Sequence, residues 1–391
     1  MRVDEIKNYL ILNKSHLLNT ILEGKYRPQS LRRVSIPKDN GKTRELGIPT
    51  VIDRVIQQSI HQILTPLYER QFSENSYGFR PRRSTHDALR HVQSYINEGY
   101  NYVVDIDLEK YFDTINRSKL IELLSRTIKD GRVISLIHKF LNSGLQIGSR
   151  VEEATAGVPQ GSPLSPLLGN IMLHELDKEL SKRGHKFVRY ADDMLILCKS
   201  RRSAERSLTS TTNFIEKKLY LRVNRAKSNV SEITKVKFLG YSFYKRDGKC
   251  RFRVSDRSWS KLKNRIREIT NRSNGKGDTY RKESLRSYIK GWVNYFKLAD
   301  MKSYLSRIDE WYRRRLRMVI WKQWKTVSTR FANLQRLGIL RQKAWEHANT
   351  RKGYWHTANS WILSVPITND RLKRAGYIFF SDYYKKVAPL H

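Results

Sequence analysis

Two adjacent aspartates in an otherwise apolar segment constrain the fold of this chain more than any other feature. The tetrapeptide at residues 190–193, Tyr-Ala-Asp-Asp, ends in Asp192 and Asp193 and lies between the apolar pieces 187–188 and 194–197. Aspartate is favoured in turns, whereas the flanking apolar residues are typical of buried strands. We therefore expect a tight hairpin that lifts two charges out of a sheet. Because burial of unpaired carboxylates is costly, such a pair needs a cation as its partner.

A second apolar strand, expected over residues 103–108, carries Asp105 and Asp107 toward its end. Two strand-end carboxylate sites are what two-metal phosphoryl transfer requires, since one ion activates the attacking hydroxyl and the other stabilises the leaving phosphate. Carboxylate oxygens are ligands that magnesium prefers. Taken by itself, an Asp-Asp pair is also compatible with a solvated turn, so the other motifs decide between the two interpretations.

Length and cysteine content limit the class of protein. A chain of 391 residues can form two or three domains, and no apolar run is long enough to span a membrane. Residues 1–12 resemble the start of an amphipathic helix rather than a secretion signal. Two cysteines, Cys198 and Cys250, cannot build a disulfide framework or a Cys/His zinc cluster. We expect a reducing, cytoplasmic setting (bacterial, nucleoid-associated), with no membrane and no disulfide partner.

The chain is strongly basic, with 76 Lys and Arg against 37 Asp and Glu, a net charge of +39 and a pI near 10.3. A charge this large opposes compaction unless a polyanion is the usual partner, which favours nucleic acid. Residues 251–391 contain 33 Lys and Arg against 10 Asp and Glu, and all eight tryptophans. This change in composition predicts a domain boundary near residue 250.

Strand and helix patterns are mixed without a regular βαβ repeat, which predicts an α+β fold. Strands are expected at 33–37 and 44–48, joined by a hairpin turn, and again around the aspartates and around Gly240. Helices are expected over 1–24, 53–68, 85–97, 118–143, 166–182, 204–218, 258–271, 282–298 and 305–324.

Several short motifs follow one another in a fixed order: 33–38 with Arg44, 76–81, 107–113, 157–166, 190–193, 223–228 and 238–241, then 291–296 and 313–325. In this order they resemble the reverse transcriptases encoded by group II introns, which also act as maturases. The resemblance covers nearly the whole chain. It implies a right-hand polymerase fold with fingers and palm over 1–249, a helical thumb or maturase domain (domain X-like) over 250–330, and a basic, DNA-binding-like region over 331–391.

The family motif, an aspartate followed after four residues by an aromatic and a second aspartate, selects the metal ligand in the first strand. Asp107, Phe112 and Asp113 fit this motif, whereas a start at Asp105 does not. The resemblance therefore implies that Asp107 and Asp192 bridge two magnesium ions, with manganese as an alternative metal, and that Asp193 assists. A contribution from Asp105 stays open.

The resemblance also assigns the nucleotide pocket. Phe112 would lie under the sugar and exclude a 2′-hydroxyl, so that deoxynucleotides are chosen, and Gln160 would line the pocket. Lys38 and Arg44 on the first hairpin would clamp the triphosphate, as guanidinium groups fit phosphate oxygens. Lys227 is expected to contact phosphate. A solvated basic hairpin and an ordinary surface lysine are the competing interpretations.

Further positions are implied to contact template, primer or other nucleic acid. These are Tyr77, Phe79 and Arg80 near the template, Phe238, Leu239 and Gly240 at the primer end, and Arg313, Arg314, Arg315, Arg317, Lys322 and Lys325 in the thumb. Arginines interleaved with aromatics suit a groove along a nucleic acid backbone. Packing roles for Tyr77, Phe79, Phe238 and Leu239, and an amphipathic helix with solvated arginines, are the alternatives.

The implied function is that of an RNA-directed DNA polymerase that extends a DNA or RNA primer with dNTPs on an RNA template. As a maturase it would also assist splicing of its intron RNA and support retrohoming into a DNA target. Alternatives are a splicing cofactor without polymerase activity and a polymerase of a defence or diversity-generating system. Relatives commonly carry an N-terminal extension and a Cys/His-rich endonuclease module. We expect neither here, and therefore no second-strand cleavage.

Overall fold

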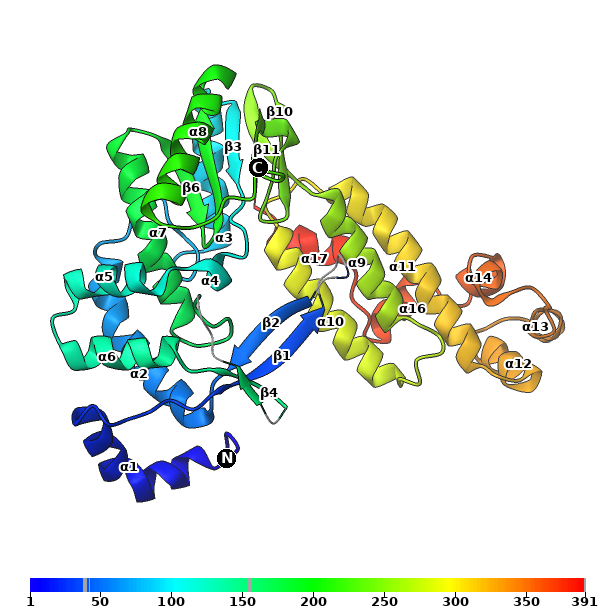
Figure 1. The fold of residues 1–391 in the computed structure, drawn as a ribbon. Coiled ribbons are helices and arrows are strands. Elements are labelled where there is room, and N and C mark those ends of the chain that lie inside the picture. The colour runs from blue at the N-terminus through cyan, green and yellow to red at the C-terminus, as the bar shows by residue number, and fades with distance from the viewer. Residues whose placement is uncertain (38–40, 42, 149, 153–156, 390–391) are drawn as a thin grey trace. The chain divides into compact units, whose positions relative to one another are not determined.

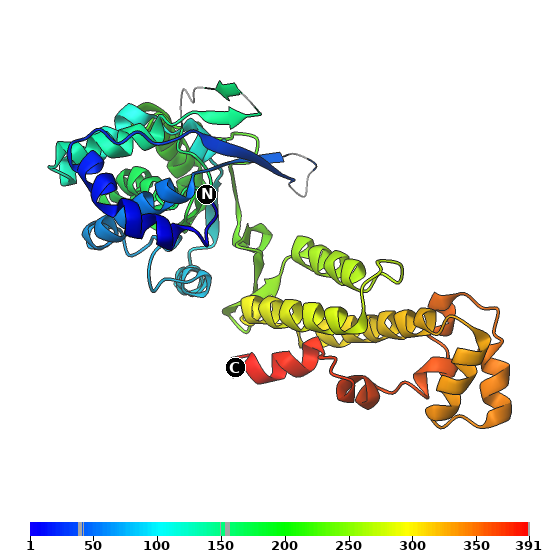
Figure 2. The same cartoon turned by 90° about the horizontal axis from the view of Figure 1, so that it is seen from below.

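A computed structural model describes residues 1–389 except 38–40, 42, 149 and 153–156. The chain divides into two compact units, residues 1–236 and 237–391 (Figures 1 and 2). The boundary expected near residue 250 falls within the last strand of a hairpin that packs with the second unit. Helices and antiparallel strands are mixed, which confirms the α+β class.

The palm of the first unit is a sheet in the order β6-β7-β3-β8 (Figure 1). Its strands are β3 (Tyr102–Ile106), β6 (Lys186–Tyr190), β7 (Asp193–Cys198) and β8 (Asn229–Glu232), and all pairs are antiparallel. The side chains from Met194 to Cys198 are buried, which explains why β7 is apolar without alternation. Helix α8 (Arg201–Lys218) packs on β3, β7 and β8.

The core of this unit lies between the palm sheet and its helices. Helix α7 (Ser165–Lys182) is buried along most of its length. It contacts α5 (Arg117–Thr127), α2 (Val51–Glu69) and α8. The remaining helices of the unit are α1 (Ile6–Leu22), α3 (Thr85–Asn97), α4 (Tyr111–Thr114), α6 (Gly131–Leu141) and the 3-10 turn Ile233–Lys235.

A second sheet in this unit has the order β2-β1-β4-β5. The hairpin of β1 (Leu31–Pro37) and β2 (Thr43–Ile48) was expected from the alternating sequence, whereas the parallel pairing of β1 with a distant segment was not. That segment supplies β4 (Leu145–Ile147) and β5 (Arg150–Glu152).

The second unit begins with a three-stranded sheet and continues as helices. Strands β9 (Lys237–Phe238), β10 (Tyr241–Arg246) and β11 (Lys249–Val254) are antiparallel. Its long helices are α9 (Asp256–Ile269), α10 (Asp278–Phe296) and α11 (Lys302–Gln323), each beginning slightly before the predicted start. Shorter helices follow: α12 (Val327–Arg336), α13 (Arg341–Ala348), α14 (Tyr354–Thr357), α15 (Trp361–Ser364), α16 (Asn369–Arg374) and α17 (Phe380–Val387). Within the described ranges, none of the helices combines the length and apolarity needed to cross a membrane.

Candidate active site

Strand register brings the aspartates of two distant segments to the same end of the palm sheet. Asp105 pairs with Leu195 and Ile106 with Met194, so the next residue, Asp107, lies beside Asp193. Tyr190 pairs with Asp193 across the β6–β7 hairpin, which leaves Ala191 and Asp192 as a two-residue turn. Ala191 has φ 57°, a left-handed conformation that is rare for alanine and is imposed here by the turn.

The carboxylates at this sheet end interact electrostatically. Burial, followed by the negative charges of Asp192, Asp105 and Asp107, raises the pKa of Asp193 to about 6. Burial and then Asp107 raise the pKa of Asp105 to about 6 as well. Crowded carboxylates with raised pKa values are typical of a site that binds cations or protons.

The turn at residues 224–228 holds Asp107 in place. The Asn224 amide donates to the Asp107 carbonyl at 2.8 Å, and the Asp107 amide donates to Ser228 Oγ at 3.0 Å. From the same turn, Lys227 Nζ lies 3.2 Å from Asp107 Oδ2. The motif at 223–228 therefore hydrogen-bonds the backbone of Asp107 and places a cation beside its carboxylate.

Arg189, which was not among the residues predicted for the site, anchors the aspartate hairpin. Its guanidinium is buried and donates to Asp177 Oδ1 at 2.8 Å, to Asn170 Oδ1 at 2.9 Å and to the Ala191 carbonyl at 2.9 Å. A lone arginine within an apolar strand was the signal that could have revealed it. Helix α7, which carries Asp177 and Asn170, thus fixes the turn that carries Asp192.

The loop at residues 76–81 lies directly against the aspartate turn. A Cβ atom on Gly78 would stand 2.2 Å from the Ala191 amide nitrogen, so only glycine fits. The Gly78 carbonyl accepts a hydrogen bond from Asn170 Nδ2 at 2.8 Å, and the Tyr77 amide donates to the Arg189 carbonyl at 2.9 Å. The loop supports the turn through backbone contacts.

Phe112 lies on the short helix α4 and packs against Tyr111, with ring centroids 5.1 Å apart. Tyr111 donates to the Gly169 carbonyl at 2.6 Å, and a Cβ on Gly169 would lie 3.1 Å from Phe112 Cε1. Helix α7 therefore fixes both rings. Only a small residue fits at position 169, because both rings pack against it.

The glycine-rich loop at 157–163 contacts two of the other motifs. Gln160 Nε2 donates to Asp113 Oδ1 at 2.9 Å, and the Gln160 carbonyl accepts from the Gly47 amide at 2.8 Å. Gly157 has φ 82°, and a Cβ there would stand 2.7 Å from the Phe112 carbonyl oxygen. The loop thus joins Phe112 to strand β2, which carries the exposed Arg44. Lys38, the other predicted triphosphate ligand, lies outside the described residues.

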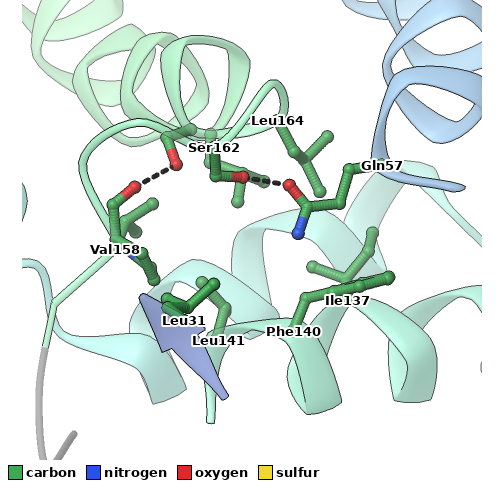
Figure 3. A pocket seen from close by; sticks show the side chains of 11 residues that line it. Leu31, Gln57, Ile137, Phe140, Leu141, Val158, Ser162 and Leu164 are labelled. Atoms are coloured by element: carbon green, nitrogen blue, oxygen red, sulfur yellow. Dashed lines mark hydrogen bonds between the residues drawn. The ribbon is translucent and has the colours of Figure 1, made fainter. Parts of the chain in front are cut away.

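Beneath this loop, a cavity of about 10 Å³ is bordered by Val158, Ser162, Leu164, Gln57 and Phe140 (Figure 3). Such a volume holds about one water molecule. Ser162 donates to Gln57 across it. The cavity is a packing feature under the loop and not a nucleotide site.

Comparison with known proteins agrees with this arrangement. Residues 36–243, more than half of the chain, match the model of the reverse transcriptase (RNA-dependent DNA polymerase) family. The chain belongs to the reverse transcriptase family. Residues 259–338 match the group II intron, maturase-specific domain. The resemblance to group II intron-encoded reverse transcriptases with a maturase segment is thereby confirmed.

Three curated relatives match between 43% and 60% of this chain. It is 41% identical to Protein YkfC of Escherichia coli (strain K12) over 171 residues, 43% of this chain and 45% of that protein. It is 40% identical to the group II intron-encoded protein LtrA of Lactococcus lactis subsp. cremoris over 180 residues, 46% of this chain and 30% of that protein. A putative COX1/OXI3 intron 2 protein of Saccharomyces cerevisiae is 30% identical over 293 residues, 60% of this chain and 34% of that protein. The matched segments cover less than half of each relative.

The carboxylates at this end of the palm sheet are of the type that a divalent cation such as magnesium binds. Within the described part of the chain, no three His, Cys, Asp or Glu side chains form a complete metal cage. Magnesium is, however, usually held by one or two carboxylates together with water and substrate phosphates. Asp107 and Asp193, neighbours across β3 and β7, with Asp192 next to them in the turn, can supply one or two such carboxylates.

The predicted template residues differ in what they contact. Tyr77 is buried and its hydroxyl lies 2.6 Å from His91 Nδ1. Arg80 is also buried, and its guanidinium donates to Glu69 at 2.7–3.1 Å and to two backbone carbonyls. Phe79 is 58% exposed. These contacts favour structural roles for Tyr77 and Arg80 and leave Phe79 accessible.

The predicted primer-end residues form the β9–β10 turn of the second unit. Phe238 is buried, Leu239 has φ 50°, and the Leu239 carbonyl accepts from the Tyr295 hydroxyl at 2.9 Å. The Gly240 carbonyl accepts from the Ser255 amide at 3.1 Å. These hydrogen bonds fasten the turn to its own unit.

Several predicted thumb arginines bond to the protein itself. Arg314 stacks on Trp355 at 3.9 Å and donates to its carbonyl, Arg315 donates to Thr270 Oγ1 at 2.6 Å, and Arg317 donates to the Ile367 carbonyl at 3.0 Å. Arg313 lies over the Phe379 ring at 5.6 Å and Lys322 over Tyr354 at 5.2 Å, whereas Lys325 is exposed. Most of these α11 cations therefore contact other segments of the second unit, before and after the helix in the chain.

Proposed function

We propose that this protein is an RNA-directed DNA polymerase of a group II intron, which extends a DNA or RNA primer with dNTPs on an RNA template. The supporting observation is the β3–β7 register, in which Asp107 follows the residue paired with Met194 and so neighbours Asp193. The match of residues 36–243 to the reverse transcriptase family gives the reaction class.

In the proposed reaction, the primer 3′-hydroxyl attacks the α-phosphate of a dNTP in line, and pyrophosphate leaves. Two magnesium ions, when bound, supply the charge that activates the hydroxyl and stabilises the leaving group. Asp107 and Asp192 are the proposed ligands, Asp193 assists them, and Lys227 balances their charge when phosphate is absent. Phe112 lies under the sugar, Gln160 orients the pocket, and Arg44 with Lys38 neutralises the triphosphate.

A primed RNA template tests this proposal. Wild-type protein with magnesium should incorporate dNTPs in preference to NTPs, and Asp192→Asn should lose the activity because one carboxylate charge is removed. Asp247→Asn is the matched control, since Asp247 is exposed in the β10–β11 turn. Extension by Asp192→Asn at a normal rate would refute the proposal.

A second proposed function is splicing of the intron RNA, supported by the maturase-specific match over 259–338. We also propose that the protein supports retrohoming into a DNA target and works in the bacterial cytoplasm near the nucleoid. The maturase match favours an intron over a defence or diversity-generating system. Parallel assays of dNTP incorporation and of intron splicing separate the two functions, because Asp192→Asn should abolish only the first.

A further inference from the structure

A pocket of about 260 Å³ lies between α9 and α11, two helices that run side by side in the second unit (Figure 1). Two of its residues lie one turn apart on α9, and four lie on one face of α11 at helical spacing. The α9–α11 pocket is lined by Lys263, Arg267, Tyr304, Arg307, Ile308 and Trp311. Its walls are therefore aromatic and cationic at once.

Two buried tryptophans hold the Tyr304 ring in place. It packs on Trp259 with ring centroids 4.1 Å apart and the ring planes tilted by 31°, and Trp259 in turn packs on Trp292 at 5.0 Å. Trp259 and Trp292 are buried, whereas Tyr304 and Trp311 are half-buried and line the pocket. An aromatic ring that is already held in place loses little entropy when a further ring stacks on it.

The cations around the pocket carry no carboxylate partner. In the described residues, no ion pair involves Lys263, Arg267 or Arg307. Lys263 Nζ lies 5.7 Å from the Tyr304 ring centroid, and the Arg307 guanidinium lies 5.4 Å from it. The α11 residues Arg314 and Arg317, by contrast, donate to backbone carbonyls. Arg267 also donates to Asn264 Oδ1 at 2.7 Å and lies over the Trp311 ring at 5.8 Å. Cations that no carboxylate neutralises remain available to phosphates.

We propose that the α9–α11 pocket takes one unpaired nucleobase of a folded RNA. The base stacks against Tyr304 and Trp311, and Lys263, Arg267 and Arg307 hold the flanking phosphates. The inference rests on the proposed function in intron RNA binding, because all six lining residues lie within the maturase-specific match at 259–338.

An unpaired base fits the pocket better than a duplex does. The base edges of an A-form helix are largely out of reach of side chains in its deep groove, so proteins recognise RNA mainly at splayed bases stacked on aromatic or arginine planes. The pocket is also slightly smaller than the roughly 300 Å³ at which sites for drug-sized ligands begin, which suits a single planar ring system.

The test compares two RNA hairpins that differ at one position. One carries a single-nucleotide bulge and the other an abasic site in place of that nucleotide, so charge and backbone are equal. Binding to the full chain is measured by fluorescence anisotropy without dNTPs. The bulged hairpin should bind roughly 5- to 100-fold more tightly, the effect expected for stacking of one base. Equal affinities for the two hairpins would overturn the proposal.

Variants of Trp311 test whether the preference for the bulged hairpin arises in the α9–α11 pocket. Trp311→Ala should remove the difference between the hairpins, and Trp311→Phe should keep part of it. Trp345→Ala is the matched control, because Trp345 is 58% exposed in the same unit but outside the pocket, and it should keep the full preference. A preference that survives in Trp311→Ala would contradict the proposed position of the base.

Arg307→Gln provides a readout that does not depend on repacking an aromatic residue. Arg307 is exposed, so this variant should fold and should bind both hairpins more weakly, with a smaller dependence on salt. An unchanged salt dependence would count against the phosphate contact.

DNA hairpins with the same bulge form a separate arm, and an equal preference on DNA would overturn the assignment to RNA. Primer extension by the wild-type chain is measured in parallel. Its absence would count against the polymerase function and leave the hairpin comparison intact.

Discussion

Arg189 and Asp177 form an ion pair in the palm that is almost completely buried, with Arg189 Nη2 2.5 Å from Asp177 Oδ2. The same guanidinium bonds to Asn170 and to the carbonyl of Ala191 in the aspartate turn. The position of the aspartate hairpin therefore depends on a charge pair anchored in α7.

Replacing Arg189 with Met should destabilise the protein and slow primer extension. The variant leaves the Asp177 carboxylate buried without a partner, which typically costs about 3–5 kcal/mol. Denaturant unfolding measures the loss. The double variant Arg189→Met/Asp177→Leu should be less destabilised than Arg189→Met, because no unpaired charge remains, yet it should still extend primers slowly. A loss below about 1 kcal/mol in Arg189→Met would contradict the anchoring role.

Gly78→Ala should impair primer extension by displacing the aspartate turn. The added Cβ would meet the Ala191 amide nitrogen at 2.2 Å, so the backbone must move. Gly131→Ala, where a Cβ meets nothing within 4 Å, is the control and should keep wild-type extension. Steady-state incorporation rates compare the two variants. Equal rates for both would show that the loop and the turn are not tightly packed in solution.

Phe112→Ala should relax the choice of sugar. With the ring removed, a 2′-hydroxyl meets no steric barrier, and the ratio of NTP to dNTP incorporation should rise by roughly tenfold or more. Phe112→Tyr retains the bulk of the ring and should keep the discrimination. Single-nucleotide incorporation with matched dNTP and NTP measures both. Unchanged selectivity in Phe112→Ala would exclude Phe112 as the sugar-reading residue.

Stability should fall in mild acid because of His174. Burial lowers the pKa of this histidine to about 4, and among the described residues neither ring nitrogen has a hydrogen-bond partner. Protonation therefore favours the unfolded state, so stability is fully present above pH 6.5 and is lost as the pH falls toward 4, by up to about 3 kcal/mol. His174→Leu should flatten this part of the curve when unfolding is measured from pH 7 to pH 4. An equally steep curve in His174→Leu would assign the loss to other groups.

Local patterns predicted much of the fold. The Asp-Asp turn between apolar strands and the β1–β2 hairpin are confirmed, because a period-2 pattern bounded by turn residues has few alternatives. The change in composition lies near residue 250, whereas the second compact unit begins at residue 237 and includes the β10–β11 hairpin.

Long-range contacts were not predictable from local patterns. The sequence singles out Arg80 as a basic residue in a loop, yet its donors are taken by Glu69, eleven positions away in the chain. Arg189 was overlooked because its partners lie on α7, and no local periodicity reports such a pairing. The α9–α11 pocket likewise depends on helix packing and not on a motif.

The central claim is that Asp107 and Asp192, from two separate strand ends, act as one metal-binding unit. Primer extension in a double-mutant cycle tests it most directly. Asp107→Asn and Asp192→Asn should each lower the single-turnover rate by at least about a hundredfold, and the double variant should be no slower than the slower single variant, because residues that act as a unit are strongly non-additive. A near-normal rate in either single variant, or losses that multiply in the double variant, would contradict it.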